Sequence, residues 1–395
     1  MAAPDFIRET LEDLKAHGLY RRLTEIGSAA GPHVEIGGRR VLQFASNNYL
    51  GLANDPRVRE AAIRAVERWG WGAGASRLVA GHTEAHAHLE ADLAAFKHAE
   101  AALVFPTGYM TNLGVVTALV GRGDLVLSDR ENHASIVDAA HLSGAHLVRY
   151  AHADAAAAAR AIESRAGKSG PPDDRQSGRP LLVTDTVFSM DGRVAPLADL
   201  AALSRRAGAM LVLDEAHATG LLGPTGAGLA EALGLEGGVT ASVGTLSKAL
   251  GGIGGFVAAS REVCDLLVNR ARPFNYSTAL PAAACEAARA ALAIVRAEPE
   301  RRGRVLDLAD GLRSRLRERG FDAGADRTPI VPVLVGEPER ALALAAGLLE
   351  RGIFCPAIRP PTVPRGTSRL RVSLTAEHTE EDVARLVAAL VAARG

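Results

Sequence analysis

Lysine is rare in this chain, and one lysine stands apart from the others by its surroundings. The 395 residues include 45 Lys and Arg, of which four are lysines: Lys15, Lys97, Lys168 and Lys248. A guanidinium stays protonated, whereas a lysine amine becomes a nucleophile when its surroundings lower its pKa. The first three lysines lie in charged or polar stretches, which predicts solvated charges. Lys248 lies in GTLSKALGG, among small and apolar residues, and is therefore the candidate nucleophile.

A carboxylate and an imidazole follow a neighbouring strand-like run. DEAHATG (214–220) comes directly after MLVL, and GTLSKALGG (244–252) comes directly after VTASV. In a parallel sheet, the groups that bind ligands lie beyond the carboxyl ends of the strands. An amine that forms a Schiff base and a carboxylate that keeps a ring nitrogen protonated make pyridoxal 5′-phosphate an electron sink. We therefore predict that Lys248 carries this cofactor, that Asp214 faces its ring nitrogen and that His217 reaches its phenolic oxygen.

Each of these residues also has a simpler explanation. Asp214 could cap a helix that follows the strand, and His217 could be a buried histidine with satisfied hydrogen bonds. Their combination with Lys248 after a second strand favours the cofactor site. His133, in SDRENHAS, could stack on the pyridine ring and bind a substrate, although a histidine in a surface turn explains it equally well.

Phosphate binding is expected at the start of a helix, where backbone N–H groups and the helix dipole both favour an anion. The segment FPTGYMTN (105–112) follows the run ALVF and places Gly108 and Tyr109 at such a start. Ser189 and Thr245 are further candidate donors, although Ser and Thr are common at helix ends for other reasons. The glycine-rich WGWGAGASRL follows a helical pattern instead of a strand, which argues against a dinucleotide site.

The elements that position these residues alternate along the chain. Strand-like runs occur at 102–105, 124–128, 146–150, 181–187, 210–214 and 239–244, separated by helical patterns. Alternation of this kind is typical of an α/β fold with a mostly parallel sheet covered by helices on both faces. We predict an N-terminal segment at 1–45, a large cofactor-binding domain at 46–285 and a smaller α+β domain at 286–395. A polar stretch at 167–180 predicts an exposed loop.

The bulk composition excludes several classes of partner. Forty-five basic residues balance 45 acidic residues, and a sequence pI of about 7.2 favours neither nucleic acid nor an anionic membrane. Cys264, Cys285 and Cys355 are far apart, so neither a disulfide framework nor a metal site is indicated. The chain shows no apolar leader or membrane-spanning run, and we expect a cytoplasmic protein.

Taken together, the motifs resemble the α-oxoamine synthases, a branch of the fold-type-I pyridoxal-phosphate enzymes. The resemblance runs from about residue 5 to about residue 390 and implies a seven-stranded type of sheet. The matching segments are SNNYLGLANDP, GAGASRLVAGHTEAHAHLE, FPTGYMTN, DRENHAS, VFSMDG, DEAHATG, GTLSKALGG, NYSTALPAA and IRPPTVPRGTSRLRVSLTAEHT.

The resemblance also implies roles for individual residues. Lys248, Asp214, His217 and His133 match the catalytic positions, and Gly108, Tyr109, Ser189 and Thr245 match cofactor-binding positions. Thr278 matches a residue that reaches the phosphate of a neighbouring subunit, which implies a homodimer with active sites at the interface. Arg21 and Thr362 match substrate-contacting positions, and Asn47 and Arg371 match groups near the amino-acid carboxylate, for which a guanidinium is suited.

The activity implied is a decarboxylative condensation of L-alanine with a pimeloyl thioester, carried on coenzyme A or on a carrier protein, in biotin synthesis. The carboxyl-terminal run AIRPPTVPRGTSRLRVSLTAEHT favours this acyltransferase over its relatives. A reaction of glycine with acetyl-CoA is the alternative within the family. A non-catalytic partner subunit of the same fold is the alternative from another class, and the presence of Lys248 argues against it.

Overall fold

The computed structural model describes residues 4–166 and 178–394, which fall into two compact units. The larger unit comprises residues 50–189 and 193–303, and the smaller unit comprises residues 4–49, 190–192 and 304–394. Residues 286–303, which the sequence assigned to the carboxyl-terminal domain, belong to the larger unit. Most of the loop expected at 167–180 lies outside the described residues.

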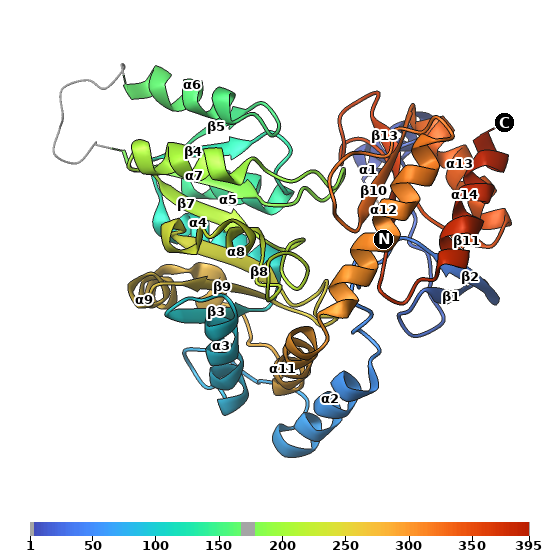
Figure 1. Ribbon diagram of the computed structural model, residues 1–395. Coiled ribbons are helices and arrows are strands. Elements are labelled where there is room, and N and C mark those ends of the chain that lie inside the picture. Colours follow the sequence, from blue (N-terminus) through green and yellow to red (C-terminus); the bar gives the residue numbers. More distant parts are fainter. Residues whose placement is uncertain (1–3, 167–177, 395) are drawn as a thin grey trace. The chain divides into compact units, whose positions relative to one another are not determined.

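The larger unit is built on a seven-stranded sheet with the strand order β3-β9-β8-β7-β6-β4-β5 (Figure 1). Neighbouring strands run parallel except at β9, which pairs antiparallel with both β3 and β8. The strands are β3 (Ala101–Phe105), β4 (Leu125–Asp129), β5 (His146–Tyr150), β6 (Pro180–Asp185), β7 (Met210–Asp214), β8 (Ala241–Thr245) and β9 (Gly255–Ala259). The predicted α/β sheet is thus confirmed, with one antiparallel strand that the sequence did not reveal.

Helices cover both faces of this sheet because the crossovers run in one direction from β3 through β4 to β5 and in the opposite direction from β5 through β6 and β7 to β8. Helices α4 and α5 pack against each other in one layer, while α6, α7 and α8 form a second series of contacting helices. The helices are α2 (Pro56–Trp69), α3 (Glu84–Phe96), α4 (Gly108–Leu119), α5 (Ala134–Ser143), α6 (Ala155–Ala166), α7 (Leu197–Arg206), α8 (Leu229–Leu233), α9 (Arg261–Arg270), α10 (Arg272–Asn275) and α11 (Ala282–Ala297).

Burial along the strands follows from this two-sided cover. Every residue of β3, β4, β8 and β9 is buried, as expected for strands with helices on both faces. Strand β5, at the sheet edge, has two exposed residues. The core between the sheet and α4 and α5 is made largely of Val, Leu, Ile and Ala, which fixes the strands whose ends carry the candidate residues.

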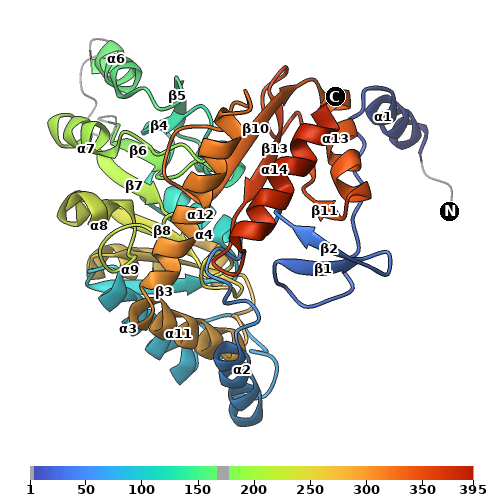
Figure 2. The same ribbon diagram turned by 45° about the vertical axis from the view of Figure 1, so that its right-hand side comes forward.

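The smaller unit is an α+β structure with two three-stranded sheets, of order β1-β2-β11 and β10-β13-β12. In Figure 2, α13 and α14 lie beside the sheet that contains β10 and β13. Its elements are α1 (Asp5–Ala16), β1 (His33–Ile36), β2 (Arg39–Gln43), β10 (Ile330–Gly336), α13 (Pro338–Glu350), β11 (Ile353–Phe354), β12 (Ala357–Ile358), β13 (Ser368–Ser373) and α14 (Glu380–Arg394), with most of α12 (Glu300–Arg317).

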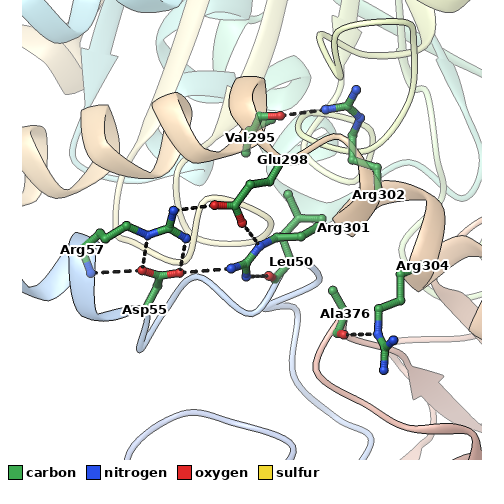
Figure 3. Close-up of polar contacts among 9 residues, drawn as sticks. All are labelled: Leu50, Asp55, Arg57, Val295, Glu298, Arg301, Arg302, Arg304 and Ala376. Atoms are coloured by element: carbon green, nitrogen blue, oxygen red, sulfur yellow. Dashed lines mark hydrogen bonds and ion pairs between the residues drawn. The ribbon is translucent and has the colours of Figure 1, made fainter.

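Two arginines and two carboxylates fasten the start of α2 to the junction of α11 and α12 (Figure 3). Asp55 caps α2 and accepts hydrogen bonds from the backbone and side chain of Arg57, while Arg301 reaches the same carboxylate at 3.3 Å. Glu298 contacts both guanidinium groups. Because several charges are shared, this network is a stronger support than an isolated surface pair.

None of the helices in the described ranges 4–166 and 178–394 has the length and apolar character needed to cross a membrane.

Candidate active site

Lys248 and His217 meet at the carboxyl end of the larger sheet. His217 follows β7 and Lys248 follows β8, and these strands are parallel neighbours, so their ends lie at one edge. Lys248 Nζ lies 2.9 Å from His217 Nε2, a separation at which one nitrogen hydrogen-bonds to the other. His217 is buried and Lys248 is half-buried. The structure therefore brings the predicted amine and imidazole together on adjacent strands.

Asp214 is the last residue of β7, and its carboxylate is fully engaged. Oδ1 accepts a hydrogen bond from the backbone N–H of Ala216 at 2.9 Å, and Oδ2 accepts one from Asn112 Nδ2 at 2.6 Å. The side chain is almost completely buried. The carboxylate thus accepts on both oxygens, and a carboxylate is the group needed opposite a protonated ring nitrogen.

A cavity of about 230 Å³ gathers most of the predicted residues of the larger unit. Seven of its lining residues were predicted from the sequence: Gly108, Tyr109, His133, Asp214, His217, Thr245 and Lys248. Polar lining residues that the sequence did not single out are Thr107, Asn112, Ser135, Asp185 and Ser247. A single cavity within one unit thus holds an amine, two imidazoles, two carboxylates and a helix start.

His133 occupies the N-cap position of α5. Its Nδ1 lies 2.8 Å from Ser135 Oγ, and the backbone N–H of Ser135 also donates to it at 3.3 Å. The surroundings of the ring lower its pKa, chiefly through burial, against an opposing effect of Asp214. The neutral imidazole is therefore the favoured form near neutral pH.

The predicted phosphate site is the start of α4. Thr107 caps this helix by accepting a hydrogen bond from the N–H of Met110 at 3.1 Å, and Gly108 is its first residue. Strand β9 approaches closely: a Cβ atom at Gly255 would lie 2.6 Å from the backbone nitrogen of Gly108. Only glycine permits this approach, so β9 supports the helix start from behind.

Thr245 and Tyr109 line the cavity with hydroxyls that already have partners. Thr245 Oγ1 donates to the carbonyl of Gly254 at 2.8 Å and lies 2.7 Å from Ser247 Oγ. Binding an anion would require Thr245 to give up one of these bonds. The phenol of Tyr109 donates to the Asp138 carboxylate, which raises the pKa of the phenol, so its backbone N–H is the better candidate for phosphate.

Two predicted cofactor residues are not among those that line the cavity. Ser189 lies in a turn beyond β6 and is half-buried. Thr278 is exposed, and its backbone forms an isolated antiparallel bridge with Ser76 of the glycine-rich segment. An exposed hydroxyl at position 278 is what the predicted contact with a neighbouring subunit requires.

The four predicted substrate residues form two groups in the smaller unit. Arg21 donates to Thr362 Oγ1 at 2.9 Å. Tyr49 donates to Asn47 Oδ1 at 3.2 Å and accepts from Arg371 at 3.1 Å. Burial raises the pKa of the Tyr49 phenol, with Arg371 opposing that rise. Sequence reasoning missed Tyr49 as the link, although it stands inside the motif SNNYLGL.

Asp185 is a second buried carboxyl group at the same sheet edge, and the sequence did not reveal its place. It ends β6 and is the register partner of Asp214 on β7. Its Oδ2 accepts a hydrogen bond from the backbone N–H of His133 at 2.7 Å. Burial, together with the nearby Asp214, raises the pKa of Asp185 well above its ordinary value. The signal available was a strand-end aspartate in LLVTDTV.

The prediction that Lys97 is a solvated charge is wrong. Its side chain is 3% exposed and pairs with the carboxylate of Glu215, whose side chain is 1% exposed. Its ammonium also donates to the carbonyl of Ala227. The stretch LEADLAAFKHAE is charged, but Lys97 lies at the end of α3, where the chain turns inward. Lys15 on α1 is exposed, as predicted, and Lys168 lies outside the described residues.

Comparison with known proteins defines the class. The family model for aminotransferase class I and II matches residues 39–390. The chain therefore belongs to the aminotransferase class I and II family.

Within that family, the chain is similar to curated relatives named 8-amino-7-oxononanoate synthase. It is 54% identical over 390 residues to the 8-amino-7-oxononanoate synthase of Anaeromyxobacter dehalogenans strain 2CP-1, covering 99% of this chain and 96% of the relative. It is 51% identical to the 8-amino-7-oxononanoate synthase of Geobacter sulfurreducens, covering 96% of this chain and 95% of the relative.

Solved structures agree with the fold. The serine palmitoyltransferase of Sphingomonas wittichii superposes with a TM-score of 0.90 at 32% identity, covering 98% of this chain and 96% of that chain. The 8-amino-7-oxononanoate synthase of Francisella tularensis gives a TM-score of 0.76 at 25% identity, covering 89% and 97%. These findings confirm the predicted family resemblance and the fold-type-I architecture. At the level of the family, they also confirm pyridoxal phosphate as the cofactor.

Proposed function

We propose that this chain forms 8-amino-7-oxononanoate from L-alanine and a pimeloyl thioester, releasing carbon dioxide and a free thiol. The observation that carries the proposal is the pairing of Lys248 with His217 at 2.9 Å in a cavity that Asp214 also lines. The names of relatives at 54% and 51% identity support the choice of substrates.

The cavity residues fit pyridoxal phosphate. An amine for the aldehyde, a hydrogen-bonded carboxylate for the ring nitrogen and free N–H groups at a helix start for the phosphate are all present in the larger unit. When bound, this cofactor draws electrons from the α-carbon of an attached amino acid, so that this carbon can lose a proton and form a new carbon–carbon bond.

The chain's own residues divide the remaining work. Lys248 would hold the cofactor's aldehyde and would accept the α-proton of the amino acid at Nζ. Asp214 keeps a proton on the ring nitrogen, and His217 orients the lysine amine. His133 presents a neutral ring to the cofactor plane. Each role follows from a strand-end position that fixes the side chain before substrate binds.

Substrate recognition is proposed for the smaller-unit residues. Arg371, held by the hydroxyls of Tyr49 and Ser373, is suited to the carboxylate of alanine, with Asn47 as a second donor. Arg21 and Thr362 are proposed to contact the acyl substrate. Ser189 is proposed as a further cofactor ligand.

Product analysis tests the reaction. Purified protein loaded with pyridoxal phosphate is incubated with L-alanine and pimeloyl-CoA, or with the pimeloyl carrier protein, and the products are identified by mass spectrometry. We expect 8-amino-7-oxononanoate. Product from glycine and acetyl-CoA alone would overturn the substrate assignment, and no product from any pair would support a non-catalytic subunit.

Reductive trapping tests the cofactor site. Borohydride treatment of the loaded protein should attach the cofactor to the peptide that contains Lys248. Lys248→Arg should lose the label, whereas Lys15→Arg, a change at an exposed lysine, should keep it. Label on another lysine would contradict the assignment.

The proposal includes a homodimer. Exposed apolar side chains surround the region of Thr278 in the larger unit: Trp71, Leu78, Val79 and Tyr276 are each more than half exposed. A group of large exposed apolar side chains of this kind marks an interaction surface. Sedimentation should give a particle of twice the chain mass. Thr278→Ala should weaken cofactor binding in this dimer. A monomer with full activity would contradict the proposed dimer.

A further inference from the structure

Four polar side chains form a continuous hydrogen-bond chain across the cavity wall. Asn112 Nδ2 donates to Asp214 Oδ2 at 2.6 Å and to Ser135 Oγ at 2.9 Å. Ser135 Oγ lies 2.8 Å from His133 Nδ1. Asn112 is 1% exposed and Ser135 is fully buried. The chain thus joins the ends of β7, α4 and α5, and it links the two groups predicted to face the cofactor ring.

The observed contacts favour one order of donors and acceptors along this chain. An ionised carboxylate accepts hydrogen bonds and donates none, so the amide nitrogen of Asn112 must face Asp214. The second hydrogen of that nitrogen then points to Ser135 Oγ. Because Ser135 Oγ accepts there, its own hydrogen is available for His133 Nδ1. The backbone N–H of Ser135 also points to that nitrogen, at 3.3 Å.

The amide of Asn112 keeps this orientation although it leaves one of its own atoms without a hydrogen bond. Within the described residues, Asn112 Oδ1 has no hydrogen-bond partner although it is buried. A buried acceptor without a partner destabilises the folded state. Turning the amide would bring its oxygen against the Asp214 carboxylate, an approach of two acceptors that the observed orientation avoids.

Building on the proposed function, we propose that Asn112 and Ser135 are positioning residues that hold His133 as the tautomer protonated at Nε2 and link that tautomer to the carboxylate of Asp214. The ring then keeps one fixed N–H donor on the side away from Ser135, ready for a substrate oxygen. A second contact fixes the backbone of the same residue, because the carboxyl of Asp185 accepts its N–H. His133 is therefore held at both its main chain and its ring.

Nitrogen NMR of the histidine rings gives the direct test. Protein labelled with ¹⁵N-histidine is measured with and without pyridoxal phosphate, and the His133 signals are assigned by their loss in His133→Gln. We expect Nδ1 to resonate as an unprotonated nitrogen and Nε2 as a protonated one in both states. A protonated Nδ1 in the unmodified protein would overturn the proposal.

Three variants separate positioning from folding. Ser135→Ala should give a mixture of tautomers and a loss of about tenfold in kcat, the effect of one hydrogen bond. Ser135→Thr retains the hydroxyl and should restore the single tautomer. Ser143→Ala removes a hydroxyl from the far end of α5, where it bonds to Ala140 O, and should change neither reading.

Asn112→Ala tests the other end of the chain. It should disturb the His133 tautomer although it touches neither ring nitrogen. If this variant does not fold, Ser135→Ala alone decides. An unchanged tautomer in Ser135→Ala would refute the chain, whatever the activity. A shifted tautomer in a protein that makes no 8-amino-7-oxononanoate would uphold the chain and refute the substrate assignment.

Discussion

Two lysines of the larger unit lie near the carboxyl end of β7, and the residues around them give them opposite roles. Lys97 meets the carboxylate of Glu215 in a site closed to solvent, with further bonds to that carboxylate from Ser242 and the N–H of Ala230. Lys248 meets the imidazole of His217 in an open cavity. The amine of Lys97 is therefore held in a buried ion pair, whereas the amine of Lys248 faces a cavity that a ligand can enter.

Two adjacent residues of the motif DEAHATG serve different purposes, one in the cavity and one in the buried ion pair. Asp214 turns toward the cavity, and the next residue, Glu215, turns into the protein beneath it. Strand geometry sends consecutive side chains to opposite sides, so adjacent carboxylates at a strand end can serve separate purposes. The predictions below test this separation from the largest expected effect to the smallest.

Removing the cavity lysine should have the largest effect. Lys248→Ala should lower product formation by about 1,000-fold or more, because both the covalent anchor and the base are lost. Lys248→Arg should be as inactive, since a guanidinium cannot supply the amine. The measurement is the rate of 8-amino-7-oxononanoate formation, with thermal unfolding as a check on folding. Activity above a tenth of the original would contradict the assignment.

Neutralising the cavity carboxylate should come next. Asp214→Asn keeps an acceptor for Asn112 but cannot hold a proton on the ring nitrogen, and we expect a loss of about 100-fold in kcat. The melting temperature should change little. A rate close to that of the original protein would show that another group performs this role.

Breaking the closed pair should affect stability more than chemistry. Lys97→Met leaves the charge of Glu215 buried without its counterion, and the expected cost is about 3–5 kcal/mol of unfolding free energy. The double variant Lys97→Met with Glu215→Gln should regain part of this loss, because Gln carries no charge yet still accepts from Ser242. Urea unfolding gives the comparison. A single variant as stable as the original would mean that the pair is dispensable.

Lowering the pH should have the smallest effect, through a histidine on the helix that Lys97 ends. Burial lowers the pKa of His86 to about 4, and its Nδ1 accepts the N–H of Thr83. Its folded pKa lies below the unfolded value, so stability is retained above about pH 6.5 and falls as the pH drops toward about 4.

Between about pH 7 and pH 5 we expect a loss of about 1–3 kcal/mol from this residue. His86→Gln should flatten the pH dependence of the urea midpoint, and His88→Gln, at an exposed site on the same helix, should leave it as it is. Equal slopes in all three proteins would contradict the role of His86.

The sequence predicted the strands that are apolar throughout, because two-sided burial leaves a clear pattern. The runs at 102–105 and 210–214 match β3 and β7. Strand β9 was missed because GFVAA is short, rich in small residues and preceded by glycines, so no strand signal stands out. Its antiparallel direction depends on pairing with β3 and β8, which local sequence does not encode.

Some residues of the candidate site could likewise be predicted from the sequence, and others could not. Residues with rare chemistry, such as Lys248, or with a strand-end motif, such as Asp214, could be found from type and spacing. Asn112 and Ser135 could not, because Asn and Ser are common at turns and helix ends. Their part in the site arises from hydrogen bonds between elements distant in sequence. Lys97 shows the reverse case, since its charged neighbours concealed a buried position.

The close contact between Gly255 and Gly108 leaves no room for a side chain at position 255 beside the anion site. With 2.6 Å between the backbone nitrogen of one and the place a methyl group would take on the other, even alanine at position 255 acts as a wedge. The added methyl group would press on Gly108 and Thr111 and so displace the first turn of α4, where the phosphate is proposed to bind. Phosphate binding at the start of α4 therefore depends on Gly255, a residue of β9 that takes no part in the chemistry itself.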